Sequence, residues 1–328
     1  MTRVRIPTSA YKKMEENIKQ KITSPKLGQS KERLGTRVSR FHDKHYKTLL
    51  VIPAIILLAS FIYMGVFYSK NHDFMNKDIS LTGGTSVTIY EKISPEKIQQ
   101  DLSGKLDDLD AREISDLITR EQKAVIIETK SDADTTKTVL EEYLGYTLNE
   151  ENSSFEFTGS SLSQSFFKQL LIAVIVAFFL MAIVVFLLFR TFIPSIAVIV
   201  AAFADIFMTL TVFNLLGFKI SSAGIIAFLM LIGYSVDTDI LLTNRVLRRH
   251  GESLNRKIWG AFKTGMTMTL TSLLAVIFAL IVVGSFSAVL TQIFTILTIG
   301  LLFDMFNTWV TNVSIIKWYA IKIEKNEH

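Results

Sequence analysis

The sequence contains no cysteine among its 328 residues. Disulfides, thiol catalysis and cysteine-ligated metal sites are therefore excluded. The five histidines show no spacing that would place two of them on one helix face as metal ligands. No Gly-Lys-Ser or Gly-Lys-Thr motif is present, so the chain lacks a phosphate-binding loop for ATP hydrolysis. We therefore predict no enzymatic activity, no cofactor and no metal ion.

The composition indicates a membrane protein. Hydrophobic residues make up 49% of the chain, and 24 residues are phenylalanine. The net charge of +5 could suggest a nucleic-acid partner. However, lysine and arginine gather at the ends of apolar runs, which is how membrane proteins distribute them. Nucleic acid is therefore not an expected partner, whereas a lipid membrane is.

The first 47 residues are polar and basic, with thirteen Lys or Arg against four acidic residues. Residues 1–47 are predicted to be a cytoplasmic tail attracted to anionic lipid, and residues 9–22 could form an amphipathic helix on that surface. The apolar run 48–68 follows and is long enough to cross about 30 Å of hydrocarbon. Because it begins so far from the start, we interpret it as a retained signal anchor, not a cleaved signal peptide.

Residues 70–168 are predicted to form a soluble domain in which acidic residues outnumber basic ones by eight. Strands are predicted at 78–90 (broken at Gly83-Gly84), 111–118, 123–129 and 153–158. Helices are predicted at 95–109, with Ser94 as its N-cap, and at 135–144, ended by Gly145. The order β-α-β-β-α-β predicts a ferredoxin-like α+β fold.

Five further apolar runs complete a predicted six-span chain, and together they form a helical bundle at 169–316. They lie at 169–189, 193–216, 222–243, 267–283 and 289–316. The basic flanks at Arg190, 244–263 and the tail 317–328 fall on the same side as residues 1–47. The acidic domain falls on the other side. Because basic flanks face the cytoplasm, we predict a multi-pass protein of the cell membrane with both termini cytoplasmic.

Four aspartates interrupt these apolar runs: Asp205, Asp237, Asp239 and Asp304. A carboxylate at the centre of a bilayer costs about 2.5–3.5 kcal/mol on insertion scales, so such residues usually face the bundle interior and mark ion or proton pathways. The alternative is a structural role as interhelical hydrogen-bonding groups, each bond contributing about 0.6–2 kcal/mol.

Asp237 and Asp239 point about 200° apart on one helix, so an undistorted helix cannot bring both to one narrow site. One could face an ion path while the other contacts a neighbouring helix or a partner subunit. Arg245 follows this span, and either joins the ion site or extends its charge to the membrane interface.

Two further groups of polar residues are candidate linings of a hydrated path. In the last span, Gly300, Asp304, Asn307 or Thr308, and Thr311 share a face at helical spacing. In the fifth span, hydroxyls occur at Thr264, Thr267, Thr269, Thr271 and Ser272. The fifth-span hydroxyls could equally serve as small residues that let helices approach closely.

Two motifs resemble those of a known family. The segment Asp-Ile-Ser-Leu-Thr-Gly-Gly at 78–84 resembles the Asp…Thr-Gly-Gly signature that SecD and SecF proteins carry after their first span, which singles out Asp78, Thr82, Gly83 and Gly84. The segment 233–240, with Gly233, Ser235 and Thr238, resembles the SecF motif of the fourth span. With the six-span plan, the chain is similar to the SecF family of protein-export membrane proteins, in an archaeal-like form.

The resemblance implies six transmembrane helices that form half of a resistance-nodulation-division-type bundle, with one extracytoplasmic ferredoxin-like domain. It implies a heterodimer with SecD that assists the SecYE channel and the translocating polypeptide, driven by a proton or sodium gradient. It makes the span-four carboxylate the candidate ion carrier. Two alternatives remain: a half-size transporter of the same superfamily, and a purely structural stabiliser of the export channel.

This chain departs from the bacterial pattern at two places. Bacterial relatives commonly read Asn-Asp-Thr where this chain reads Asp237-Thr238-Asp239. They also carry a basic residue near the start of span five, where this chain reads Thr264-Gly265-Met266-Thr267. The bacterial ion route is therefore not transferred to this chain residue by residue.

Overall fold

The computed structural model describes residues 48–326, except 117–118, 120, 249–251 and 285–286. The predicted basic tail, residues 1–47, lies outside this part of the chain.

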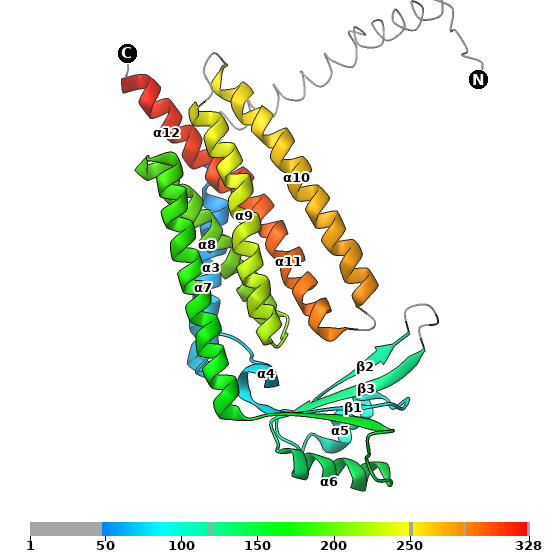
Figure 1. Ribbon diagram of the computed structural model, residues 1–328. Coiled ribbons are helices and arrows are strands. Elements are labelled where there is room, and N and C mark those ends of the chain that lie inside the picture. The colour runs from blue at the N-terminus through cyan, green and yellow to red at the C-terminus, as the bar shows by residue number, and fades with distance from the viewer. Residues whose placement is uncertain (1–47, 117–118, 120, 249–251, 285–286, 327–328) are drawn as a thin grey trace, which may run out of the picture. The chain divides into compact units, whose positions relative to one another are not determined.

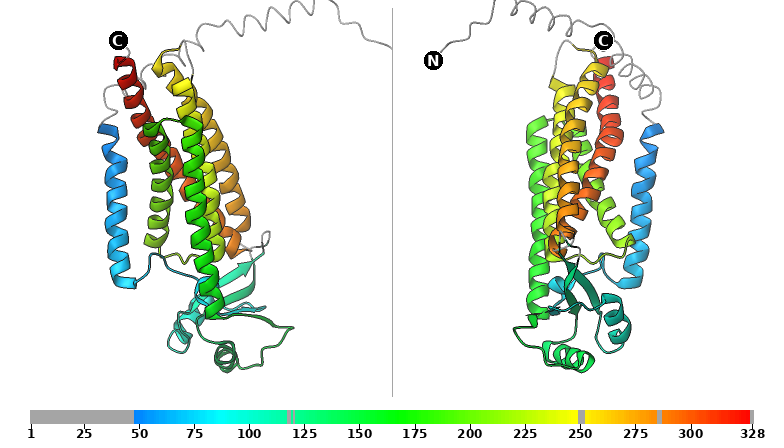
Figure 2. Two further views of the ribbon diagram at one scale, coloured as in Figure 1. Left: turned by 60° about the vertical axis from the view of Figure 1, so that its left-hand side comes forward. Right: turned by 90° about the vertical axis from the view of Figure 1, so that its right-hand side faces the viewer.

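Six helices of the described chain are long and apolar enough to cross a membrane. They run side by side, and the sheet domain lies at one end of the bundle (Figure 1; Figure 2). They are α3 (Val51–Asn71), α7 (Ser160–Phe189), α8 (Phe192–Leu215), α9 (Ser222–Arg248), α10 (Leu254–Val283) and a last helix made of α11 (Ala288–Phe306), the π-helical segment η1 (Asn307–Asn312) and α12 (Val313–Asn326).

Several of these helices are longer than the apolar runs that predicted them. Helix α7 begins at Ser160 and not near 169, α10 begins at Leu254 and not near 267, and α12 continues to Asn326 through the predicted tail. A helix continues beyond its apolar segment wherever the following residues favour helical backbone hydrogen bonding. Hydropathy identifies only the apolar segment. The membrane helix α7 therefore starts directly after the last strand.

Helices α8 and α9 form the centre of the bundle. Each is 56% buried over its most apolar window, against 28% or less for the other four helices. The main apolar core contains Phe213 of α8, Phe228 and Leu231 of α9, and Ile296 of α11. Helix α9 packs against α7, α8, α10 and α11, so polar groups on most of its faces are enclosed by protein.

The sheet domain has the ferredoxin-like arrangement that the sequence predicts. Its elements are β1 (Gly84–Ile89), α5 (Pro95–Leu102), β2 (Asp110–Ser115), β3 (Gln122–Thr129), α6 (Ala133–Leu144) and β4 (Ser153–Thr158). All strand pairs are antiparallel, in the order β2-β3-β1-β4. Val87 and Ile127, opposite each other in the register, are buried with Ile98 of α5 and Leu140 of α6.

The prediction of a strand from residue 78 is wrong. Residues 79–82 form a short helix, α4 (Ile79–Thr82), and β1 starts only at Gly84. The Thr82 amide and hydroxyl both donate to the Asp78 carbonyl, at 3.1 Å each. This local bonding closes a helical turn that strand propensity alone does not reveal.

Candidate functional site

Three carboxylates from three helices meet in the middle of the bundle. Asp205 of α8, Asp239 of α9 and Asp304 of α11 each have no exposed surface. They are surrounded by hydroxyl and amide side chains of α9 and η1. We refer to Asp205, Asp239 and Asp304 as the carboxylate cluster.

Within the cluster, Asp205 has a donor for each oxygen. The Ser235 hydroxyl donates to Oδ2 at 2.6 Å, and the Asn307 side-chain amide donates to Oδ1 at 2.7 Å. The sequence singled out Ser235 only as a motif residue, and the structure gives it this contact. A buried carboxylate with both oxygens bonded is held in one orientation.

Asp239 has its donors on one oxygen only. Its Oδ1 accepts from the Thr308 hydroxyl at 2.8 Å and from the Asn312 amide at 2.6 Å, whereas Oδ2 is buried with no partner among the described residues. Asp304 is similar: Oδ1 is 3.3 Å from the Thr308 hydroxyl and Oδ2 has no described partner. The cluster therefore has two enclosed acceptor atoms that are left without a donor.

The π-helical segment η1 supplies most of the donors. Asn307 bonds Asp205, and Thr308 and Asn312 bond Asp239. Single π turns in otherwise α-helical segments are frequent at functional sites. Thr308 and Asn312, four residues apart, donate to the same carboxylate, and the predicted stripe did not contain this pair. The stripe's Thr311 donates to the Asn307 side-chain oxygen at 3.3 Å, and the backbone of Gly300 packs against Leu231.

Every side-chain donor to the cluster in the described chain is neutral. Arg245 instead donates to the Gly260 carbonyl at 2.6 Å and the Thr264 hydroxyl at 3.1 Å, where it joins α9 to α10. Burying several negative charges without a cation destabilises the fold, because removing each charge from water costs several kcal/mol even after the protein relaxes around it. The arrangement is thus suited to taking up positive charge.

The remaining residues of the span-four motif lie on other sides of α9. Asp237 and Gly233 are exposed, and Asp237 has no hydrogen bond or ion pair with any described residue. The Thr238 and Thr269 hydroxyls are 3.3 Å apart between α9 and α10. Of the two neighbouring aspartates, only Asp239 belongs to the cluster.

The first motif lies where the sheet domain joins the bundle. The Asp78 amide donates to the Ile220 carbonyl at 3.0 Å, and the Ile220 amide donates to the Asn76 carbonyl at 2.6 Å. Ile220 lies in the loop between α8 and α9, so this short parallel bridge ties the chain leading into the domain to the start of α9. The motif therefore serves as a structural joint.

The two motif glycines fit close backbone contacts at this joint. A Cβ on Gly83 would lie 2.5 Å from Cα of Ser160, the first residue of α7, and one on Gly84 would lie 2.3 Å from the Thr129 carbonyl oxygen of β3. Gly83 also has φ of +84°, in the region that favours glycine. Side chains at these positions would push β1 away from β3 and from α7.

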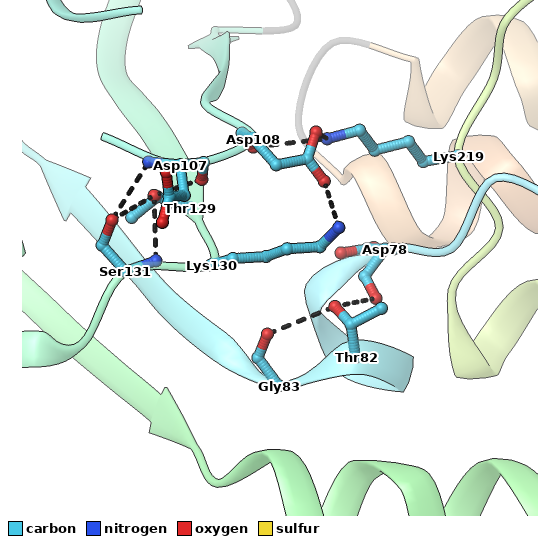
Figure 3. A network of polar contacts seen from close by, with 9 residues as sticks. All are labelled: Asp78, Thr82, Gly83, Asp107, Asp108, Thr129, Lys130, Ser131 and Lys219. Carbon is cyan, nitrogen blue, oxygen red and sulfur yellow. Dashed lines mark hydrogen bonds and ion pairs between the residues drawn. The ribbon is translucent and has the colours of Figure 1, made fainter. Parts of the chain in front are cut away.

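An ionic bridge also crosses the joint (Figure 3). Lys219 of the α8–α9 loop lies 2.8 Å from Asp108, which also pairs with Lys130 at 3.1 Å. Partial burial alone would raise the pKa of the Asp108 carboxyl, but hydrogen bonds from Lys219 and Lys130 lower it below its usual value. On the bundle side, the Gln292 side chain of α11 donates to the Lys219 carbonyl and accepts from Ser221.

A cavity of about 650 Å³ lies beside this bridge, lined by strand β2, the α8–α9 loop and the start of α11. Glu128 lines it and bonds Arg112. Burial and the nearby charge of Asp78 raise the pKa of Glu128 to about 7, against the opposing effect of Arg112. The proximity of Glu128 to Asp78 was not expected from the sequence, because the two are fifty residues apart.

Known proteins resemble this chain in sequence and in fold. Residues 138–322 match the family model described as protein export membrane protein SecD/SecF, C-terminal. The chain is 39% identical to the protein-export membrane protein SecF of Methanocaldococcus jannaschii, covering 84% of this chain and 96% of that one. It is 35% identical to SecF of Methanolacinia petrolearia, covering 84% and 94%.

In fold, the chain is similar to the crystal structure of SecDF, a translocon-associated membrane protein from Thermus thermophilus, with a TM-score of 0.65 at 22% identity. The similarity covers 84% of this chain but only 38% of that one, so the chain corresponds to a part of that longer protein. The family match and the identity to archaeal relatives over nearly their whole length lead to one conclusion: the chain belongs to the SecD/SecF family of protein-export membrane proteins, on the SecF side of it.

Proposed function

We propose that this chain is the SecF subunit of a SecDF complex, which assists export through the SecYE channel by coupling cation flow to movement of its outer domain. The observation that carries the proposal is the carboxylate cluster. Among the residues that the structure describes, Asp239 and Asp304 each keep one enclosed oxygen without a donor, and no Lys or Arg donates to them. A proton or a sodium ion moving through the cluster would neutralise it.

The energy available is sufficient for such coupling. Moving one charge across a potential of 100 mV supplies about 2.3 kcal/mol. That free energy biases a two-state equilibrium by about fifty-fold. Taking up a cation also removes the desolvation penalty of a buried carboxylate, so helix packing around the cluster responds to occupancy.

The joint provides a route from the cluster to the outer domain. Helix α9 carries Asp239 and starts directly after Ser221, and α11 carries both Asp304 and Gln292. Movement of either helix pulls on the α8–α9 loop, in which Ile220 bonds the chain leading into the sheet domain and Lys219 pairs with Asp108 of that domain. The outer domain in turn contacts the emerging polypeptide.

The proposed orientation puts both termini in the cytoplasm and the sheet domain outside the cell membrane. Arg190, Arg245, Arg248 and Lys257 all lie at the bundle end opposite the sheet domain, consistent with the positive-inside rule. Three of these residues donate to backbone carbonyls there: Arg245 to Gly260, Arg248 to Leu188, and Lys257 to Val246.

The test is export into inverted membrane vesicles that contain the chain, its SecD partner and the SecYE channel, with imposed proton or sodium gradients. Asp239→Asn is expected to abolish stimulation by the gradient while the complex stays assembled. Ser314→Ala is the matched control, because Ser314 is equally buried but donates only to its own helix, at Val310. If the gradient stimulates export by Asp239→Asn as strongly as export by the wild type, coupling is wrong and a purely structural role in stabilising the channel is the remaining explanation. Separate proton and sodium gradients identify the ion.

Experiments with the same vesicles distinguish the proposed function from that of a half-size transporter. A transporter for lipids or drugs would move its substrate under a gradient without SecYE or an exported polypeptide. The proposed subunit has no effect without them.

A further inference from the structure

Two carboxyl groups of the sheet-domain side border the cavity at the joint. Asp78 immediately precedes α4, and Glu128 lies near the end of β3. The β3 residues Val125 and Ile127 are buried in the core that the sheet shares with α5 and α6. Because side chains alternate along a strand, Glu128 lies on the opposite face of the sheet, where it lines the cavity. Neither carboxyl belongs to the carboxylate cluster inside the membrane.

Both groups are poorly satisfied as charged carboxylates. Asp78 does not cap α4, and its Oδ1 is enclosed with no hydrogen-bond partner among the described residues. Glu128 is 13% exposed and accepts a hydrogen bond from Arg112 of β2. Asp110 lies directly opposite Glu128 in the strand register. Glu128 is therefore close to one cation and to two other carboxylates.

The cavity as a whole has an excess of negative charge. Its acidic residues are Asp78, Asp108, Asp110, Glu113 and Glu128, and its basic residues are Arg112 and Lys219, with Lys130 paired to Asp108. The other polar neighbours of Glu128 from β1, α5 and α11 are uncharged: Ser86, Gln99 and Gln292. In the described chain no group of three or more Asp, Glu or His side chains could hold a metal ion. A proton is the cation that a pair of carboxyl groups can hold instead.

The surroundings of Glu128 support a bound proton near neutral pH. Burial and the charge of Asp78 raise the pKa of Glu128 to about 7, against the opposing effect of Arg112. A protonated carboxyl is a hydrogen-bond donor, which the enclosed Oδ1 of Asp78 lacks. One proton therefore removes the repulsion between two carboxylates and supplies a donor to an acceptor that has none.

We propose that Glu128 and Asp78 form a proton-binding site on the outer side of the membrane, where one proton is held between the two carboxyl groups and fastens the sheet domain to the start of α9. With the proton bound, Glu128 is a neutral acid and Asp78 remains a carboxylate. When the proton leaves to water, both groups are charged and repel each other. The proposal rests on the proposed function in one respect, namely the orientation that puts the sheet domain outside.

The site acts on the joint through α4. The Asp78 amide donates to the Ile220 carbonyl at 3.0 Å, and the Ser80 hydroxyl accepts from the amide of Ser222, the first residue of α9, also at 3.0 Å. Because α4 is a single turn, repulsion that displaces Asp78 disturbs both contacts. The raised pKa of Glu128 means that the proton stabilises the joint in acid and that this stabilisation is lost as the outer pH rises through about 7.

The first test is hydrogen exchange of the full chain in lipid nanodiscs between pH 5 and pH 9, corrected for the intrinsic exchange rate. Protection of the Asp78 and Ser222 amides is expected to fall as the pH rises through about 7, by at most about tenfold per pH unit for one proton. In Glu128→Gln the protection should stay at its acid level, because the side-chain amide cannot ionise and still donates. Wild-type protection that ignores pH, or an unchanged pH dependence in Glu128→Gln, would overturn the proposal.

The part played by Asp78 is tested in the same way. Asp78→Asn removes the neighbouring charge and keeps an equally good N-cap residue, so the midpoint of the transition is expected to move to lower pH. Glu156→Gln is the matched control, because Glu156 lies opposite Ser86 on the far side from Glu128 and is exposed on the same sheet. The control should keep the wild-type midpoint. A wild-type midpoint in Asp78→Asn would show that the proton is not shared.

Infrared spectroscopy detects the proton without any substitution. The cluster inside the membrane contains aspartates only, so labelling glutamate carboxyls with ¹³C separates Glu128 from it. A glutamic-acid carbonyl band is expected in the wild type at pH 6 and should vanish by pH 9. The absence of such a band at pH 6 would overturn the proposal, whatever the stability of the variants.

The joint site and the coupling mechanism fail separately. If the joint amides lose protection through pH 7 in both the wild type and Asp239→Asn, the joint site stands whatever the export assay shows. If the transition is lost in Asp239→Asn, the proton belongs to the cluster and the joint site is wrong. If Asp239→Asn abolishes gradient-driven export and the joint amides ignore pH in the wild type, the joint site alone fails.

Discussion

Asp237 and Asp239 are separated by one residue, yet Asp239 is fully buried in the bundle and Asp237 lies on its outer surface. The separation of about 200° around the helix divides the motif into an inward half and an outward half. The inward half belongs to a cluster that needs positive charge. The outward half is left without a partner in the described chain.

Replacing Asn312 is expected to impair the cluster. Asn312→Ala removes one of two donors to Asp239 Oδ1, while Thr308 still donates, so the loss is that of a single hydrogen bond, about 0.5–1.5 kcal/mol. We expect a lower melting temperature and reduced gradient-driven export, both measured on the reconstituted complex. Ser314→Ala, two residues further along the same helix, should change neither. Full export by Asn312→Ala would show that Asp239 does not depend on this bond.

Replacing Gly83 is expected to weaken the joint between the sheet domain and α7. In Gly83→Ala the new Cβ meets the backbone of Ser160 at 2.5 Å, and the φ of +84° adds strain of about 1–3 kcal/mol. Gly145→Ala measures the cost of a left-handed helical backbone without a steric contact, because Gly145 has φ of +80° and ψ of 12° with nothing within 4 Å of its Cβ, whereas Gly83 has ψ of 157°. Urea unfolding should show a larger loss for Gly83→Ala. Equal losses would mean that neither the contact with α7 nor the backbone conformation of Gly83 adds to the cost of a positive φ.

Breaking the bridge between Lys219 and Asp108 is expected to loosen the domain only slightly. The two side chains are 29% and 37% exposed, so a double-mutant cycle with Lys219→Met and Asp108→Asn should give a coupling of about 0.2–1 kcal/mol, weakened by salt. Because the pKa of Asp108 is lowered in the fold, this stabilisation is present above pH 3.8 and is lost as the pH falls through the folded value. Hydrogen exchange of amides in the α8–α9 loop measures this stabilisation. A coupling free energy that persists at pH 2 would contradict an ion pair between Lys219 and Asp108.

Glu128 is expected to make the outer domain less stable at alkaline pH. Its pKa rises from 4.5 in the unfolded chain to about 7, so the folded domain binds its proton more tightly. The resulting stabilisation is complete below pH 4.5 and is lost as the pH rises through about 7, with a total on the order of 3 kcal/mol. Glu128→Gln should flatten this dependence when hydrogen exchange of β3 amides is followed against pH. Glu156→Gln, at an exposed position on β4, should not.

The sequence was sufficient for the spans, the strand order of the domain and the family, because each depends on long periodic or apolar patterns. It was not sufficient for helix ends. Leu254 to Met266 is helical but amphipathic, with Trp259 and Lys263 in one turn, so hydropathy placed the start of α10 too late. The segment after Asp78 was misjudged for a related reason, since a helical turn of four residues is too short to show a period.

The cluster could be predicted only in part. Four acids in apolar runs were visible, but which of them meet depends on helix rotation, and the sequence left Asp237 and Asp239 open. Asn312 was missed because the stripe in the last span was continued from Thr308 to Thr311, three residues on, and not to Asn312, four residues on, although both spacings fit one helix face. No residue type marks a π turn, so the change of spacing at Asn307 was visible only in three dimensions.

The π turn at Asn307–Asn312 also joins two distant parts of the molecule. Each residue of an α-helix advances the chain by about 100° of rotation, so returning this wide turn to α geometry would swing everything beyond it through a comparable angle. Asn312, at the end of the turn, would then move away from Asp239, and the fourteen residues of α12 would rotate with it. The hydrogen bond from Asn312 to Asp239 and the rotation of the C-terminal helix about its axis therefore depend on the backbone geometry of the same turn.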